Sequence, residues 1–420
     1  MKFSKFNSVI ELDEGLIIYN AFSGGILRLD NEHATRYRTL WDNKDEMLLG
    51  ALKKGNMIIP DAMDERVLLR HQSNIASNDT STMSLTIAPT MACNFRCPYC
   101  YEKGKEYTTL DDRILEAVVS YINKHTESGG IRTLAVAWYG GEPLLRMDLI
   151  RRIRQGITTE GTVLKQVIVT NGYLLSEDIA AELEAMGVER AQVTIDGPPE
   201  IHNKSRIHHD GRDTFNTILE NIKRAIKHIR VSIRVNVNRE TLSQVDRLLD
   251  YLDDFELSGE VSVYLAPIDN FHGKCNGALC LDHEEFSVEE FEFLKRNANR
   301  GYFRLNVGSF IPTICSATCV NSFVIDPLGN LYKCWEYIGD EEHKVGDVFT
   351  GLNFGTAMKR WQDYDYLKHE ECQECSILPA CKGGCPKRVV DGNFHVCSTN
   401  RYNLQPLLEL MHQRKPIQQK

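Results

Sequence analysis

The chain has 420 residues, enough for two or three domains, and 42 % of them are hydrophobic, which is enough to fill a core. The net charge of -9 gives no reason to expect a nucleic-acid-binding surface. Residues 1–7 lack the apolar stretch of a signal peptide, and no apolar run reaches the ~18 residues that span a membrane. We therefore expect a cytoplasmic protein with no membrane partner, whose thirteen cysteines mostly bind metal rather than form disulfides.

The first eighty residues have the pattern of a small, separate α+β unit. Strand-like runs at residues 10–12, 16–19 and 25–29 are separated by turn-forming residues. Helical patterns follow at residues 32–41, 44–53 and 64–75, before a Ser/Asn/Thr-rich linker at residues 77–82. Three strands followed by three helices predict a winged-helix-like domain over residues 1–80.

Strand-like and helix-like segments then alternate as far as residue 268. Six apolar, β-branched runs suit parallel strands that are buried on both faces. They lie at residues 84–88, 134–139, 166–170, 192–195, 231–237 and 261–265. Amphipathic helices are expected between them, one of which begins after an N-cap at Ser176 and stops at Gly187. These repeats predict an α/β fold, a partial (β/α)6 TIM-like barrel over residues 81–270.

A cysteine triplet follows the first predicted strand. Cys93, Cys97 and Cys100 have C-x3-C-x2-C spacing, with an aromatic residue before the third cysteine. Three thiolates in this spacing can bind three irons of a four-iron, four-sulfur cube and leave the fourth iron open to a substrate or cofactor. A zinc site or a disulfide pair is the alternative, but zinc would need a fourth Cys or His, and none flanks the triplet. Active sites of such barrels lie at the carboxyl ends of strands, which is where the triplet is expected.

The end of the second predicted strand carries Gly140-Gly141-Glu142-Pro143, whose glycines let the backbone approach a ligand and whose Glu142 can accept from an ammonium group. With the triplet, this segment resembles the radical S-adenosylmethionine (SAM) enzymes. The resemblance implies that the open iron binds SAM and that cluster reduction breaks SAM to a 5′-deoxyadenosyl radical. In this family the Gly-Gly-Glu-Pro segment holds the amino group of SAM.

The resemblance also implies SAM contacts at the later strand ends. Thr194 and Asn236 would contact the carboxylate and ribose, with Arg206 as a further candidate, and Leu265 lies in a segment that would pack on the adenine. Taken alone, each polar residue could instead be ordinary turn chemistry at a strand end.

The cysteines return in a second pattern after the predicted barrel. Cys319, Gly329 and Cys334 have C-x9-G-x4-C spacing, and a C-x2-C-x5-C-x3-C run with one later cysteine follows. This layout resembles the SPASM extension of radical SAM enzymes and implies two auxiliary four-iron clusters in a SPASM domain over residues 311–420 that ends in a helix. The first cluster would be held by Cys315, Cys319, Cys334 and Cys385. The second would be held by Cys372, Cys375, Cys381 and Cys397.

These assignments give three four-iron clusters and use eleven of the thirteen cysteines. In some relatives a substrate thiol would replace the ligand that Cys315 provides. Cys275 and Cys280, at the start of a bridging segment over residues 271–310, remain as packing residues, loop thiols or partners of a substrate thiol. A zinc ribbon could explain residues 372–385 alone, but not the spacing from Cys319 to Cys334.

The whole pattern resembles SPASM peptide maturases. The N-terminal domain resembles the element that binds the leader of ribosomally made precursor peptides as an added strand, with a structural cap on the barrel as the alternative. Sulfatase maturases of this class make formylglycine and carry Asp directly after the cysteine that corresponds to Cys334. This chain has Trp335 there, followed by Glu336.

This departure favours a natural-product maturase of the thioether-forming type. Its partners would be a precursor peptide with its leader and an external electron donor of the flavodoxin or ferredoxin type. Formylglycine formation, carbon–carbon crosslinking and epimerisation are the alternative reactions. From a different class, a non-catalytic iron–sulfur redox sensor would also use clustered cysteines.

Overall fold

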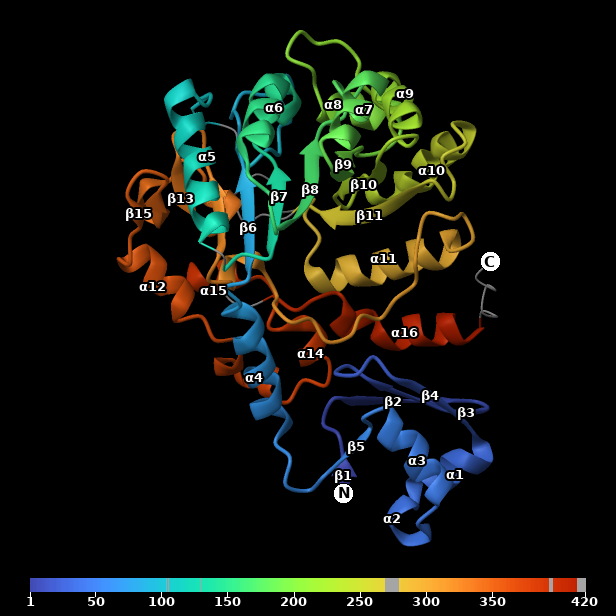
Figure 1. Cartoon of the computed structure of the whole chain (residues 1–420). Helices are drawn as coiled ribbons and strands as arrows, with labels where there is room; N and C mark the ends of the chain where they lie inside the picture. The colour runs from blue at the N-terminus through green and yellow to red at the C-terminus, as the bar shows by residue number, and fades with distance from the viewer. Residues whose placement is uncertain (103, 105, 129, 269–278, 393–395, 414–420) are drawn as a thin grey trace. The chain divides into compact units, whose positions relative to one another are not determined.

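The structure, a computed structural model, describes residues 1–102, 104, 106–128, 130–268, 279–392 and 396–413 (Figure 1). The chain divides into two compact units, each assembled from segments that are distant in sequence. The larger unit contains residues 79–304 and 320–362, and the smaller contains residues 1–78, 305–319 and 363–420. In the described part of the chain, no helix combines the length and the apolar character needed to cross a membrane.

Six parallel strands, paired in chain order, form the barrel part of the larger unit. They are β6 (Thr82–Ile87), β7 (Thr133–Trp138), β8 (Val163–Thr170), β9 (Val188–Thr194), β10 (Arg230–Val237) and β11 (Val261–Pro267). Each contains most of one apolar run recognised in the sequence, so the predicted α/β partial barrel is confirmed.

Helices on the outer side of these strands complete the barrel (Figure 1). They are α5 (Asp112–Glu127), α6 (Met147–Gly156), α7 (Glu177–Ala185), α8 (Pro199–Ser205), α9 (Phe215–Ala225), α10 (Val245–Asp254) and α11 (His283–Asn297). The predicted limits of α7 are confirmed, because the Ser176 hydroxyl accepts from the Ile179 N–H at 3.3 Å and Gly187 has a φ of 86°.

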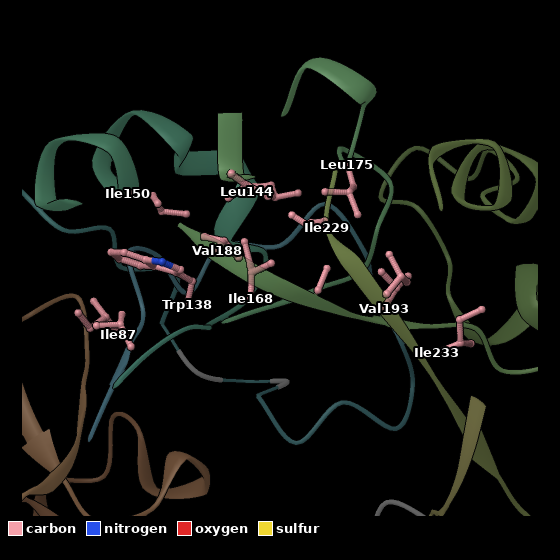
Figure 2. Close-up of a cluster of buried hydrophobic side chains, with 14 of the residues drawn as sticks. Ile87, Trp138, Leu144, Ile150, Ile168, Leu175, Val188, Val193, Ile229 and Ile233 are labelled. Carbon is pink, nitrogen blue, oxygen red and sulfur yellow. The ribbon is translucent and has the colours of Figure 1, made fainter. Parts of the chain in front are cut away.

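One hydrophobic core joins the sheet to these helices. Figure 2 shows Trp138 of β7, Ile168 of β8 and Ile150 of α6 among its side chains. Burial of each large apolar side chain contributes about 1.5–3 kcal/mol. The indole N–H of Trp138 donates to Gln166 Oε1 at 3.1 Å, so the largest ring of the core leaves no polar atom unsatisfied.

Four further strands extend the sheet beyond β6. They are β12 (Ser322–Ile325), parallel to β6, and the antiparallel β13 (Asn330–Tyr332), β14 (Gly346–Asp347) and β15 (Gly351–Leu352). The structure therefore divides the region assigned to one C-terminal domain. Residues 320–362, which end in α12 (Thr356–Gln362), belong to the barrel unit because β12 continues its hydrogen-bonded sheet.

The smaller unit begins with two antiparallel sheets and four helices. β2 (Asn7–Leu12), β3 (Gly15–Asn20) and β4 (Ile26–Asp30) form one sheet, and β1 (Lys2–Phe3) pairs with β5 (Ile58–Ile59). The helices are α1 (Asn31–Arg38), α2 (Leu40–Asn43), α3 (Glu46–Lys54) and α4 (Glu65–Ser77). Leu16 and Ile18 of the wholly buried β3 pack with the helices in a small core.

The cysteine-rich end of the chain completes the same unit. It contains α13 (Glu370–Gln373), α14 (Leu378–Cys381), α15 (Pro386–Val390) and α16 (Asn400–Gln413). Phe6 and Leu69 from the N-terminal segment share a hydrophobic cluster with Tyr366 and Leu378. The buried ammonium group of Lys382 donates to the Ser73 hydroxyl and lies 4.5 Å from the centre of the Phe310 ring. Residues 1–78 therefore do not form an isolated unit.

Candidate functional site

The cysteine triplet lies on the loop after β6, at the carboxyl end of the first barrel strand, as predicted from the sequence. A neighbouring segment holds this loop, because the Arg96 N–H donates to the Ile207 carbonyl at 2.7 Å and the His209 N–H donates to the Asn94 carbonyl at 2.8 Å. Burial, together with the nearby Glu142 carboxylate, raises the pKa of Cys93 to about 12. Thiols in such surroundings ionise readily only when a cation, such as a bound metal, supplies the opposing charge.

The two glycines after β7 let the backbone of this turn lie directly against the backbone of the cysteine loop. Gly140 has a φ of 114°, and an added Cβ there would clash with the Thr90 carbonyl oxygen. A Cβ on Gly141 would meet the carbonyl oxygen of Ala92, one residue before the triplet. Glycine is therefore required at both positions to seat this turn against the cysteine loop.

The Glu142 carboxylate links the end of β7 to the end of β8 through hydrogen bonds. It is fully buried and accepts from the Thr170 hydroxyl at 2.7 Å, the Asn171 N–H at 2.7 Å and the Leu144 N–H at 3.0 Å. Burial raises the pKa of Glu142. A carboxylate has about four acceptor positions, and these three hydrogen bonds use three of them. The fourth position remains for a ligand. Pro143 begins the short η1 (Pro143–Arg146) directly after it.

Asp196, two residues after β9 ends, is the centre of a buried polar network. Its carboxylate accepts from the Tyr99 hydroxyl, from the Ser205 hydroxyl at 3.0 Å and from Asn236 Nδ2 at 3.2 Å. Tyr99 lies between the second and third cysteines, so the network joins the triplet loop to β9 and β10. Asp196 was not among the residues predicted for the site, although an acidic residue just after a predicted strand was a usable signal.

Arg206 brings a buried positive charge to this network. Its Nη1 donates to the Tyr99 hydroxyl at 3.0 Å, and its guanidinium carbon lies 5.5 Å from the centre of the Phe95 ring. Burial lowers the pKa of Arg206, but Tyr99, Cys97 and Asp196 raise it by more, so the group stays charged. Its buried Nε has no hydrogen-bond partner within the described residues. An anionic ligand at this position would satisfy that donor.

A cavity of about 410 Å³ opens beside the network. This volume lies within the range of small-molecule sites. Tyr99, Asp196 and Asn236 line it, together with Ile268 and Leu279. Of the other candidate contacts, Thr194 and Leu265 are buried at their strand ends, and neither they nor Arg206 belong to the described lining.

Four cysteines gather in the smaller unit. Burial, together with the charges of Cys381, Cys375 and Cys397, raises the pKa of Cys372 to about 12. Arg401 Nη1 donates to Cys397 Sγ at 3.5 Å. The charges of these four thiols act on one another, so the thiols are neighbours, and four thiols are the number of ligands that zinc or an iron–sulfur cluster takes.

The remaining cysteines are divided between the units. Cys315, Cys319 and Cys385 lie in the smaller unit, where burial raises the pKa of Cys315 and the other two thiols add to the shift. Cys334 lies in the larger unit, directly before η4 (Trp335–Tyr337). Cys275 lies outside the described residues, and Cys280 precedes the N-cap of α11.

Residues 87–252 match the model of the Radical SAM superfamily. The chain contains a radical SAM domain. The cysteine-type anaerobic sulfatase-maturating enzyme of Clostridium perfringens is 26 % identical over 337 residues, which cover 72 % of this chain and 88 % of the relative. The serine-type enzyme of Bacteroides thetaiotaomicron is 26 % identical over 359 residues, covering 71 % and 82 %.

Two solved structures have a similar fold. anSMEcpe with bound AdoMet and the Kp18Cys peptide has a TM-score of 0.61 at 23 % identity, covering 79 % of this chain and 98 % of that one. Streptococcus suis SuiB bound to the precursor peptide SuiA has a TM-score of 0.56 at 14 % identity, covering 95 % and 99 %.

The described residues are compatible with the cofactors of the superfamily. The triplet offers three thiols for three irons of a four-iron cluster. The unsatisfied Arg206 Nε suits a carboxylate, such as the one that SAM carries. The adjoining cavity has the volume for a small organic ligand.

Proposed function

We propose that this radical SAM enzyme modifies a ribosomally made precursor peptide and joins a cysteine sulfur of the peptide to one of its carbon atoms. The observation that carries the choice of reaction is Trp335. An indole ring, which cannot act as a carboxylate base, follows Cys334 and stacks on Tyr139 at the barrel edge. The relatives named for sulfatase maturation make formylglycine formation the second candidate, with Glu336 as the nearby carboxylate.

In this proposal Cys93, Cys97 and Cys100 hold the cluster that activates SAM. When bound, the cluster and SAM supply the radical that removes a hydrogen atom from the substrate. Arg206 donates to the carboxylate of SAM, and Asn236 orients the ligand from the wall of the cavity. Asp196 and Tyr99 fix the loop that carries the thiols, so that the reacting groups are held at close range.

Thr194, Leu265 and the segment from Gly140 to Pro143 complete the proposed SAM site. The turn after β7 would present its backbone to the amino group of SAM, and its two glycines let it pack directly against the cysteine loop. Thr194 and Leu265 are buried at their strand ends and would support the SAM site from there.

Two auxiliary clusters are proposed as electron acceptors. One is held by the gathered thiols of Cys372, Cys375, Cys381 and Cys397. The other is assigned to Cys315, Cys319, Cys334 and Cys385. An external flavodoxin-type or ferredoxin-type protein would reduce the radical cluster, consistent with an enzyme of the cytoplasm.

We assign leader binding to the N-terminal strands and helices. The order of three antiparallel strands followed by helices supports this, as does the similarity to SuiB over 95 % of the chain. Leader capture would place the reacting core of the peptide at a high effective concentration.

Mass spectrometry of the peptide encoded beside this gene, co-expressed with the enzyme, tests the reaction. A thioether removes two hydrogens, so the expected product is about 2 Da lighter per crosslink and has lost one alkylatable thiol. Conversion of cysteine to formylglycine would replace the sulfur by a carbonyl oxygen. Unchanged mass, or retention of every free thiol, would exclude thioether formation.

A further inference from the structure

An aromatic pair lies at the carboxyl end of β7, next to the cysteine triplet. The rings of Trp335 and Tyr139 are stacked, with centroids 5.3 Å apart and an interplanar angle of 13°. The Tyr139 hydroxyl is hydrogen-bonded to Tyr101, the residue that follows Cys100. Gly140, on the other side of Tyr139, begins the proposed SAM-binding turn. The pair is thus connected to both parts of the radical site within one unit.

The two rings differ in their access to solvent. Tyr139 is partly buried, and its hydroxyl is hydrogen-bonded to that of Tyr101. Trp335 is 45 % exposed, although one face of its indole is covered by Tyr139. The Trp335 indole N–H has no hydrogen-bond partner among the described residues. The Trp335 indole, stacked on Tyr139 on one face, therefore presents its exposed apolar surface and its N–H donor at the edge of the site.

We propose that Trp335 determines substrate specificity by stacking against an aromatic side chain of the peptide, next to the residue that is attacked. This inference rests on the proposed peptide substrate, but not on the type of bond formed. A flat ring supported by a second ring favours a flat partner, because offset stacking adds to the burial of apolar area. The indole N–H would donate to a backbone carbonyl of the same peptide and fix its position.

Full-length reconstituted enzyme, titrated anaerobically with three acetylated hexapeptides, tests this proposal. Each peptide contains one cysteine, and they differ only in its neighbour, which is Phe, Leu or Asp. We expect the Phe peptide to bind about tenfold more tightly than the Asp peptide, and the Trp335→Ala variant to lose most of that ratio. Trp335→Phe, which keeps a flat ring, should retain it.

Phe354→Ala is the matched control, because Phe354 is 71 % exposed in the same unit and is not stacked on another described ring. It should leave all three dissociation constants unchanged. Iron content and circular dichroism establish that each variant is folded and loaded. Equal binding of the peptides, or an unchanged ratio in Trp335→Ala, overturns the inference. A normal ratio, together with unchanged mass of the co-expressed precursor peptide, would instead contradict only the proposed reaction.

Discussion

The guanidinium group of Arg206 brings a positive charge into the buried polar network of the site. It is buried and charged, it donates to Tyr99, and its Nε is unsatisfied among the described residues. Such a group is costly to bury without an anionic partner. Its spatial position could not be predicted from sequence, because Arg206 comes near the triplet only when the segment after α8 folds back along the cysteine loop.

Replacing Arg206 by Met should weaken SAM binding by about 10-fold to 150-fold, since a hydrogen bond to a charged group contributes about 1.5–3 kcal/mol. Anaerobic equilibrium dialysis of the reconstituted variant measures this. Arg212→Met is the control, because Arg212 is exposed and pairs with Asp210. SAM affinity that is unchanged in Arg206→Met would remove Arg206 from the proposed site.

Among the elements, the barrel strands were the most predictable and the added strands the least. β-branched apolar runs and the Ser176 cap act locally, so they can be read from the sequence. The parallel pairing of β12 with β6 joins residues more than two hundred positions apart, such as Ser322 and Ser84. No local pattern encodes that partnership. The same limit applies to Asp196, whose position after β9 was visible but whose partners were not.

Helix α8 is expected to make stability sensitive to acid. His202 is buried, its Nδ1 accepts from the Asp196 N–H at 3.4 Å, and its Nε2 lies 3.1 Å from the Thr214 hydroxyl. Burial lowers the pKa of His202 well below its usual value of 6.5. The unfolded chain therefore binds a proton near pH 6.5 that the folded chain does not, so stability is lost as the pH falls below that value.

Chemical unfolding of wild type and His202→Gln between pH 8 and pH 5 measures this effect. The wild type should lose up to about 1.4 kcal/mol more per pH unit than the variant below pH 6.5. His71→Gln, at an exposed position, is the control and should follow the wild type. Parallel pH curves for wild type and His202→Gln would contradict a buried neutral imidazole.

For the whole molecule, the central expectation is its metal content. Eleven cysteines in three sets predict about twelve irons per chain after anaerobic reconstitution, by the four-iron stoichiometry of the clusters. The Cys93→Ala, Cys97→Ala, Cys100→Ala triple variant should retain about two thirds of the iron and form no 5′-deoxyadenosine. Stoichiometric zinc with about four irons would disprove the auxiliary clusters and leave the radical cluster intact.

The shared core of the smaller unit has a consequence for biosynthesis. Phe6 and Leu69 are made before the barrel strands, whereas Tyr366 and Leu378, with which they pack, are made after them. The barrel strands β6 to β11 are synthesised in between and can fold first, because their neighbours in the sheet are consecutive in the chain. Phe6 and Leu69 therefore keep part of their apolar surface exposed until that later segment has been made. Assembly of the proposed cluster on Cys372 and its neighbours would therefore follow the synthesis of the barrel strands.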